Sequence, residues 1–407
     1  MKEKKALKKS LRFLMSERTK ELPVSIFEQL FEAAKTRPGV ISLGPGEPDF
    51  VTPDYILDAL KERLHEATHY STPGGRPELK EVIAKKLSRE NKIKVNDPEK
   101  ELIVTTGSTE ALLLAFMSIA DVTEEVLVPN PSFLAYTPMI ELIDCQSTSI
   151  PLHEETGFQL DLDEARKRIT PKTTGIVLNS PANPTGTVFK KKALEEVAEL
   201  AVEHDLMVLS DEAYEHFVFG DAKHKSIASL NGMHEYVISF YSFSKSYAMP
   251  GFRVGYAVGP EWVIKDMTGI HMYSTLCAPT PSQVAAFEAM NNKKESDASI
   301  KLMKEAYDER RKYLLERIKG IDGLHVKVAP EGAFYIFPRF DFKMTSREFA
   351  LWVLDKANAV VIPGTEFGHN GEGFIRLSYA TALPEIEEAM NRIEEALNKA
   401  KLKKRKE

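Results

Sequence analysis

The chain has 407 residues, of which 43% are hydrophobic and 28% are charged, and its formal net charge is −6. This composition is typical of a folded globular protein, and a mildly acidic chain is a poor candidate for non-specific nucleic-acid binding. The two cysteines, Cys145 and Cys277, are too few for a disulfide framework or a cysteine-rich zinc site. We therefore expect a cytoplasmic protein of two or three domains, with no metal site.

The N-terminal sequence does not predict a secretory signal. The N-terminus is basic between Lys2 and Arg12, but no apolar region follows it, and no segment reaches the ~18 consecutive apolar residues of a membrane helix. A solvated helix is the favoured interpretation of this basic run, and a membrane-surface or RNA-binding segment is the alternative. The basic tail at 402–407 is interpreted in the same way.

Taken in chain order, the first 50 residues contain Gly44, Pro45, Gly46 and Pro48 and predict an extended, turn-rich arm. The middle of the chain alternates short apolar runs with amphipathic stretches, which predicts a mostly parallel sheet flanked by helices. A charged helical region follows from about 281 to 320, and then a shorter α+β region. The predicted strands are 102–105, 125–128, 174–178, 206–209, 237–241 and 254–258, with helices from 110, over 191–204 and over 299–319.

This pattern predicts an α/β fold with three parts. They are an N-terminal arm over 1–52, a large α/β domain over 53–293, and a small α+β domain over 294–407 to which the arm contributes. In an open α/β sheet, ligands bind beyond the carboxyl ends of the strands, so the residues that follow each predicted strand are the candidates for a functional site.

The segment after the strand at 102–105 contains Gly107, Ser108 and Thr109 and opens a helix. Small residues at a helix N-terminus suit a phosphate, because free backbone N–H groups and the helix dipole face it. The alternative is that Ser108 or Thr109 simply caps the helix. The segment from Asn179 to Gly186 follows the predicted strand at 174–178 and is by itself a turn-forming loop.

Two later strand ends carry ionisable side chains. Asp211 either caps the next element or faces a bound cation or a protonated ring nitrogen, and Tyr214 follows three residues on. Lys245 lies among hydroxyl and apolar residues, with Arg253 eight residues later. A surface lysine is the commoner reading of any single lysine. A partly buried lysine would have its charged form disfavoured, which makes the amine a better nucleophile towards carbonyl groups.

Together these features suit a phosphorylated heteroaromatic aldehyde, and the chain resembles the fold type I pyridoxal-phosphate enzymes, specifically the class I and II aminotransferases, from about residue 23 to 396. Within that family it is most similar to broad-specificity aspartate and aromatic enzymes of archaea and bacteria. The motifs that carry the resemblance are Gly46-Glu47-Pro48-Asp49-Phe50, Tyr70 with Gly74-Gly75, Asn183-Pro184-Thr185-Gly186, Ser210-Asp211-Glu212-Ala213-Tyr214, Ser242-Phe243-Ser244-Lys245, Gly251-Phe252-Arg253-Val254-Gly255 and Phe374-Ile375-Arg376-Leu377-Ser378.

The resemblance implies pyridoxal 5′-phosphate as cofactor and a role for each matching residue. Lys245 would bond covalently to the cofactor and move the substrate proton, and Asp211 would keep the pyridine nitrogen protonated. The phosphate-binding residues would be Gly107, Ser108, Thr109, Ser242 and Arg253. The remaining cofactor contacts would be Phe133 stacked on the ring, Asn183 and Tyr214 at the phenolic oxygen, and Tyr70 reaching the phosphate of the other subunit of a homodimer.

For the substrates, the resemblance implies an amino acid and a 2-oxo acid such as 2-oxoglutarate, in ping-pong order. Arg376 would hold the α-carboxylate, with Gly46 and Asn183 beside it. One aspartate-specific branch carries a lysine next to the position of Thr109, and this chain has none there. Pro250 is also atypical for its motif. Asn130-Pro131 and Asn183-Pro184 match bonds that are often cis in this family.

Two other classes remain open at this point. The first is another reaction on the same cofactor, such as a carbon–sulfur β-lyase or a cyclopropane-forming synthase. The second is a cofactor-binding regulatory or scaffolding protein, for which an attached DNA-binding domain would be expected. Lys245, Asp211 and Arg376 together argue against the second class.

Overall fold

The computed structural model describes residue 16, residues 25–400 and residues 402–405. The basic run between Lys2 and Arg12 lies outside the described residues, as do the last two residues of the basic tail. Across residues 25–400, no helix combines the length and the apolar content needed to cross a lipid bilayer.

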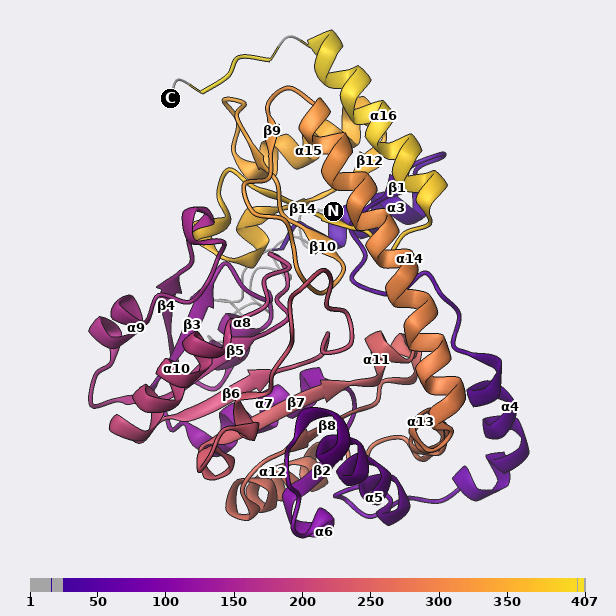
Figure 1. The fold of residues 1–407 in the computed structure, drawn as a ribbon, viewed down its shortest axis with the longest axis vertical. Helices are drawn as coiled ribbons and strands as arrows, with labels where there is room; N and C mark the ends of the chain where they lie inside the picture. The colour runs from indigo at the N-terminus through magenta and orange to yellow at the C-terminus, as the bar shows by residue number, and fades with distance from the viewer. Residues whose placement is uncertain (1–15, 17–24, 401, 406–407) are drawn as a thin grey trace, which may run out of the picture.

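A seven-stranded sheet forms the centre of the molecule, in the spatial order β2-β8-β7-β6-β5-β3-β4 (Figure 1). Strand β8 is antiparallel to both of its neighbours, and the other strands run in a common direction, so the mostly parallel α/β sheet predicted from the sequence is confirmed. The strands are β2 (Leu102–Thr105), β3 (Glu125–Asn130), β4 (Gln146–Pro151), β5 (Thr173–Asn179), β6 (Met207–Asp211), β7 (Val237–Ser242) and β8 (Gly255–Val258).

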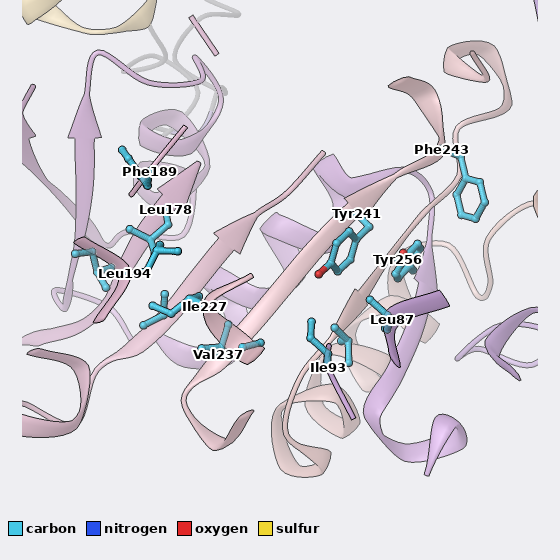
Figure 2. Close-up of a cluster of buried hydrophobic side chains, with 14 of the residues drawn as sticks. Leu87, Ile93, Leu178, Phe189, Leu194, Ile227, Val237, Tyr241, Phe243 and Tyr256 are labelled. Carbon is cyan, nitrogen blue, oxygen red and sulfur yellow. The ribbon is translucent and has the colours of Figure 1, made fainter. Parts of the chain in front are cut away.

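Both faces of this sheet are covered by helices, which explains why its inner strands are apolar almost throughout. Alternate residues of a strand point to opposite faces, so Leu102 and Val104 join one core cluster and Ile103 joins another. The first cluster includes side chains of α5, α10 and α13 and is shown in part in Figure 2; the second includes α7, α8 and α12. The helices are α4 (Asp54–Arg63), α5 (Pro77–Lys86), α6 (Pro98–Glu101), α7 (Ser108–Ile119), α8 (Tyr136–Leu142), α9 (Leu162–Arg168), α10 (Lys191–Glu203), α11 (Phe243–Ser246), α12 (Glu261–Ser274) and α13 (Thr280–Asn291).

The second part of the molecule is built from the two ends of the described chain. The long helix α14 (Lys293–Gly320) leads from α13 up to α16, as Figure 1 shows in orange. Strand β1 (Ile41–Ser42) pairs in parallel with β12, so the N-terminal arm is tied to this part by backbone hydrogen bonds. The other elements are β9 (Leu324–His325), β10 (Tyr335–Ile336), β11 (Arg339–Phe340), α15 (Ser346–Ala357), β12 (Ala359–Val360), β13 (Ile362–Pro363), β14 (Ile375–Ser378) and α16 (Leu383–Ala400).

The arm, α7 and β4 differ from the sequence-based expectation, and α14 begins at Lys293 rather than at 299. The arm is not wholly extended, because α3 (Phe27–Thr36) forms there and buries Leu30 against the core. Helix α7 begins at Ser108 rather than at 110. Strand β4 was not predicted, because its sequence is mostly polar; it lies at the edge of the sheet, pairs only with β3, and exposes part of its side chains.

Candidate active site

The carboxyl ends of the parallel strands meet at one edge of the sheet and enclose a small pocket of about 100 Å³. Arg253 precedes β8. Because β8 is antiparallel to its neighbours, its first residue, Gly255, pairs with Thr105 and Ser242 at the carboxyl ends of β2 and β7. The pocket thereby gathers residues from five loops. Its lining residues are Ser108, Thr109, Leu112, Phe133, Asn179, Asn183, Asp211, Ala213, Tyr214, Ser242, Ser244, Lys245 and Arg253.

One end of this pocket is suited to an anion. The N-cap of α7 is Gly107, and no side chain caps the helix, so the alternative in which Ser108 or Thr109 caps it is wrong. The carboxylate of Glu110 instead accepts the backbone N–H of Thr106 at 2.6 Å and fixes the preceding turn. The N–H groups of the first helical turn are therefore left for a ligand, as in other phosphate sites at helix N-termini.

Arg253 faces this helix end. Gly107 has a φ of 80°, and a Cβ on it would lie 2.6 Å from Nη2 of Arg253, so only glycine permits the approach. Arg253 itself has a φ of 49°, an uncommon left-handed conformation for a side-chain-bearing residue. Its Nη1 donates to the carbonyl of Pro250 at 3.1 Å, and no carboxylate of the described residues forms an ion pair with it. The hydroxyl of Ser242 also lines this end and accepts the N–H of Ser244 at 3.2 Å.

Asp211 ends β6 and is buried, with a relative exposure of 5%. Its Oδ1 accepts the backbone N–H of Ala213 at 3.1 Å, and its Oδ2 accepts the hydroxyl of Tyr136 at 2.6 Å. Burial raises the pKa of Asp211, while these two hydrogen bonds and the charge of Lys245 act in the opposite direction. Asp211 therefore caps the following loop, and it also lines the pocket, where a cationic ring nitrogen would offset its desolvation.

Lys245 lies in the one-turn helix α11, directly after β7, and its side chain enters the pocket. The surface-lysine interpretation is therefore wrong. Its Nζ donates to the carbonyl of Gly46 and lies 5.8 Å from the ring centres of Tyr214 and Phe334. Burial, followed by the positive charge of Arg376, lowers the pKa of Lys245 to about 8. The carboxylate of Glu47 opposes this shift, and Arg253 adds a smaller lowering effect. A neutral, nucleophilic amine is thus accessible near neutral pH.

Arg376, on β14, is a second buried cation beside the pocket. Its Nη1 donates to Oδ1 of Asn183 at 3.0 Å and its Nη2 to the carbonyl of Gly44 at 2.5 Å, whereas its Nε has no hydrogen-bond partner in the part of the chain that the structure describes. Its guanidinium also lies 4.4 Å from the ring centre of Tyr335. Among the described residues it forms no ion pair with a carboxylate, and a planar guanidinium with only neutral acceptors suits a carboxylate ligand.

The other predicted residues differ in how close they lie to the pocket. Phe133 and Tyr214 line the pocket, and the hydroxyls of Tyr214 and Tyr335 lie 2.8 Å apart. Gly46 adjoins it, and a Cβ on Gly46 would lie 2.7 Å from the hydroxyl of Tyr335. Tyr70, by contrast, lies outside the pocket and is 82% exposed.

The sequence reasoning missed Tyr136 and Tyr335, which contact Asp211 and Tyr214 through their hydroxyls. Each is a fully buried tyrosine outside the motifs that carry the resemblance, and a hydroxyl partner cannot be read from the chain. The peptide bonds Asn130-Pro131 and Asn183-Pro184 are both cis, as is Ser180-Pro181. In the described part of the chain, no three His, Cys, Asp or Glu side chains gather as a metal site would require.

Comparison with known proteins shows the family of this chain. The family model of the class I and II aminotransferases matches residues 38–393. The chain is 45% identical to an aspartate aminotransferase of Pyrococcus abyssi and 43% identical to aromatic-amino-acid aminotransferase 2 of Thermococcus litoralis, in each case over 95% of this chain and 99% of the relative. The crystal structure of an aromatic aminotransferase from Pyrococcus horikoshii matches with a TM-score of 0.87 and 44% identity, over 92% of this chain and all of that one.

The sequence and the fold thus match this family across almost the whole length of the chain. The pocket offers an amine, a buried carboxylate and the cation of Arg253, and Arg376 lies beside it; within the described residues neither arginine pairs with a carboxylate. A phosphorylated pyridine aldehyde and an amino-acid carboxylate require such groups. The chain belongs to the class I and II aminotransferases, and it is an amino-acid aminotransferase that depends on pyridoxal 5′-phosphate.

Proposed function

We propose that this enzyme moves the α-amino group of an aspartate, aromatic or alanine-like amino acid to a 2-oxo acid such as 2-oxoglutarate, in ping-pong order. The observation that carries the proposal is the placement of Lys245 between two cations, Arg253 and Arg376, that have no carboxylate partner among the described residues. One cation would take the cofactor phosphate and the other the substrate carboxylate. Relatives that are named aspartate and aromatic aminotransferases support the substrate range.

The residues of the pocket divide between cofactor and substrate. Bound pyridoxal phosphate supplies an aldehyde and an electron-withdrawing ring, which acidify the Cα–H of an attached amino acid. The phosphate end is formed by Gly107, Ser108, Thr109, Ser242 and Arg253. Asp211, Phe133, Asn183 and Tyr214 line the same pocket. Asp211 would pair with the pyridine nitrogen, Phe133 would stack on the ring, and Asn183 and Tyr214 would donate to the phenolic oxygen.

Lys245 acts in two ways in this scheme. Its amine would hold the cofactor covalently, and when freed it would remove and return the proton at the substrate Cα. The lowered pKa of Lys245 serves both tasks, because each requires the neutral form. Gly46 supports this arrangement, since its carbonyl holds the lysine while the arm lies across the pocket.

Arg376 binds the substrate carboxylate. Its present acceptors, the amide of Asn183 and the carbonyl of Gly44, are neutral, and an ionised carboxylate is a stronger acceptor than either. Buried among aromatic rings, the guanidinium would form this pair with little competition from water.

We further propose that the active enzyme is a cytoplasmic homodimer in which Tyr70 reaches the cofactor phosphate of the other subunit. Tyr70 lies outside the pocket of its own chain and is exposed. Next to it, the hydroxyl of Thr280 donates to the carbonyl of His69 at 2.7 Å. The segment that precedes Thr280 exposes two further apolar side chains, Tyr273 and Leu276. Light scattering of the purified enzyme tests the dimer. Tyr70→Phe should weaken cofactor binding without changing the oligomeric state.

The domain division into 1–52, 53–293 and 294–407 is part of the same proposal. Its support is the core cluster that unites Leu43 of the arm with Tyr307, Phe349 and Met390 of the C-terminal region. Residues of 213–219 also join this cluster, so the two parts share an interface.

A panel of amino donors tested against 2-oxoglutarate decides the function. We expect an aspartate, aromatic or alanine-like donor to transfer its amino group to 2-oxoglutarate, and we expect each half-reaction to be observable alone. Release of pyruvate and ammonia without any 2-oxo acid would instead identify a β-lyase. Lys245→Ala should abolish turnover, and a variant that kept full activity would contradict the assignment of the amine.

A further inference from the structure

The hydrogen bond between Tyr136 and Asp211 joins two residues that are both fully enclosed. Tyr136 is the first residue of α8 and follows Phe133 by three positions, so the stacking residue and the tyrosine lie on one short segment. Its hydroxyl donates to Oδ2 of Asp211 at 2.6 Å, and the other carboxylate oxygen accepts the N–H of Ala213 at 3.1 Å. Both oxygens of Asp211 are therefore held by donors from the protein.

A hydrogen-bond donor beside Asp211 stabilises the charged form of its carboxylate. Burial alone would favour the neutral acid, which could not pair with a protonated pyridine nitrogen. A short O–H···O⁻ hydrogen bond opposes that tendency and is stronger than a bond between neutral groups. Burial and the adjacent Asp211 charge also raise the pKa of Tyr136 well above its usual value, so its proton stays on the phenol and the direction of the bond is fixed.

The tyrosine is also held rigidly. Its ring packs edge-to-face on Phe133, with 5.4 Å between ring centres, and joins the core cluster on the α7, α8 and α12 side of the sheet. The hydroxyl cannot swing away from Asp211 without disturbing that packing. The carboxylate orientation is thus set by a side chain that itself has little freedom to move.

We propose that Tyr136 is a positioning residue that keeps Asp211 ionised and aimed at the ring nitrogen of the cofactor, and that it thereby sets cofactor affinity and the acid limit of activity. The inference rests on the proposed function, since it requires the cofactor role of Asp211. Tyr136 itself lies behind Asp211 and does not line the pocket.

The chain contains a matched control for this pair. Tyr241 is likewise buried and donates to a buried carboxylate, Oε2 of Glu212, at 2.9 Å. Glu212 follows Asp211 directly, but it is held by Ser210, Ser226 and His224 and does not line the pocket. Figure 2 shows Tyr241 in the core cluster on the other face of the sheet.

The test compares Tyr136→Phe with Tyr241→Phe in the full-length enzyme, since each change removes one oxygen and keeps the ring. Tyr136→Phe should weaken binding of pyridoxal phosphate by about 10- to 100-fold, as expected for loss of a hydrogen bond to a charged group. It should also move the acid limb of the kcat profile to higher pH, because Asp211 would then bind its proton more readily. Tyr241→Phe should leave both quantities within about twofold of the wild type.

A double-mutant cycle with Asp211→Asn separates positioning from packing. If Tyr136 acts through the charge of Asp211, Tyr136→Phe should change cofactor affinity by less than about threefold in the Asp211→Asn background. Equal effects in both backgrounds would show a packing role and overturn the inference. Tyr136→His retains an N–H donor and should bind the cofactor more tightly than Tyr136→Phe; no gain over the phenylalanine variant would also contradict it.

The two proposals fail in distinguishable ways. A wild-type enzyme that does not bind pyridoxal phosphate would overturn the proposed function. A wild-type enzyme that binds it, together with a Tyr136→Phe variant of unchanged affinity and unchanged pH profile, would overturn only the role of Tyr136.

Discussion

The lowered pKa of Lys245 makes a quantitative prediction about how the apoenzyme takes up its cofactor. Burial and the charges of Arg376 and Arg253 move this pKa from 10.5 to about 8. At pH 7 about one lysine in ten would then be neutral, against about one in 3,000 for a solvated lysine, a gain of roughly 300-fold in reactive amine. The rate of covalent capture of pyridoxal phosphate should therefore rise about tenfold per pH unit below pH 8 and level off above it.

Rapid mixing of apoenzyme with pyridoxal phosphate, followed by visible absorbance, measures this profile. The charge of Arg376 lowers the pKa of Lys245 more than any other charge does, so Arg376→Gln should move the midpoint of the capture-rate profile to higher pH. Lys356→Gln, which removes an exposed lysine paired with Asp355, should leave the midpoint unchanged. A wild-type midpoint near 10.5 would show that Lys245 is solvated, and it would refute the reasoning.

Three further changes probe the rest of the pocket. Arg376→Lys removes the planar guanidinium and should raise KM for amino donors and 2-oxo acids by about 10- to 100-fold, with a smaller effect on cofactor affinity, in steady-state assays. Arg253→Ala should weaken binding of pyridoxal phosphate strongly but of unphosphorylated pyridoxal little, by fluorescence titration; equal losses would contradict a phosphate role. Gly107→Ala places a Cβ 2.6 Å from Arg253 at a φ of 80° and should lower cofactor affinity, whereas Gly269→Ala on α12, with open space around it, serves as the control.

The central sheet was predictable because its strands are buried on both faces. Buried parallel strands need apolar residues throughout, so runs such as 174–178 and 237–241 stand out from the amphipathic helices between them. The rule that ligands bind at the carboxyl ends of such strands then directed attention to Asp211 and Lys245. Strand β4 escaped prediction because an edge strand with exposed side chains lacks that apolar signature.

The contacts that complete the site could not be predicted in the same way. Asn183 and Arg376 are separated by 193 residues, and Gly44 and Arg376 by 332, yet one guanidinium joins them. Tyr136 reaches Asp211 across 75 residues. Hydrophobic periodicity reports local structure and cannot show which distant polar groups meet. The assignment of Arg376 before the structure came from family resemblance, and resemblance alone gave no role to Tyr136.

Reduction of the pyridoxal-phosphate-loaded enzyme with borohydride, followed by peptide mass spectrometry, tests whether the amine at position 245 carries the chemistry. The cofactor should be fixed as a stable secondary amine on the peptide that contains Lys245, in close to one copy per chain, and the reduced enzyme should be inactive. Labelling spread over exposed lysines, with Lys245 unmodified, would contradict the mechanism proposed for this pocket.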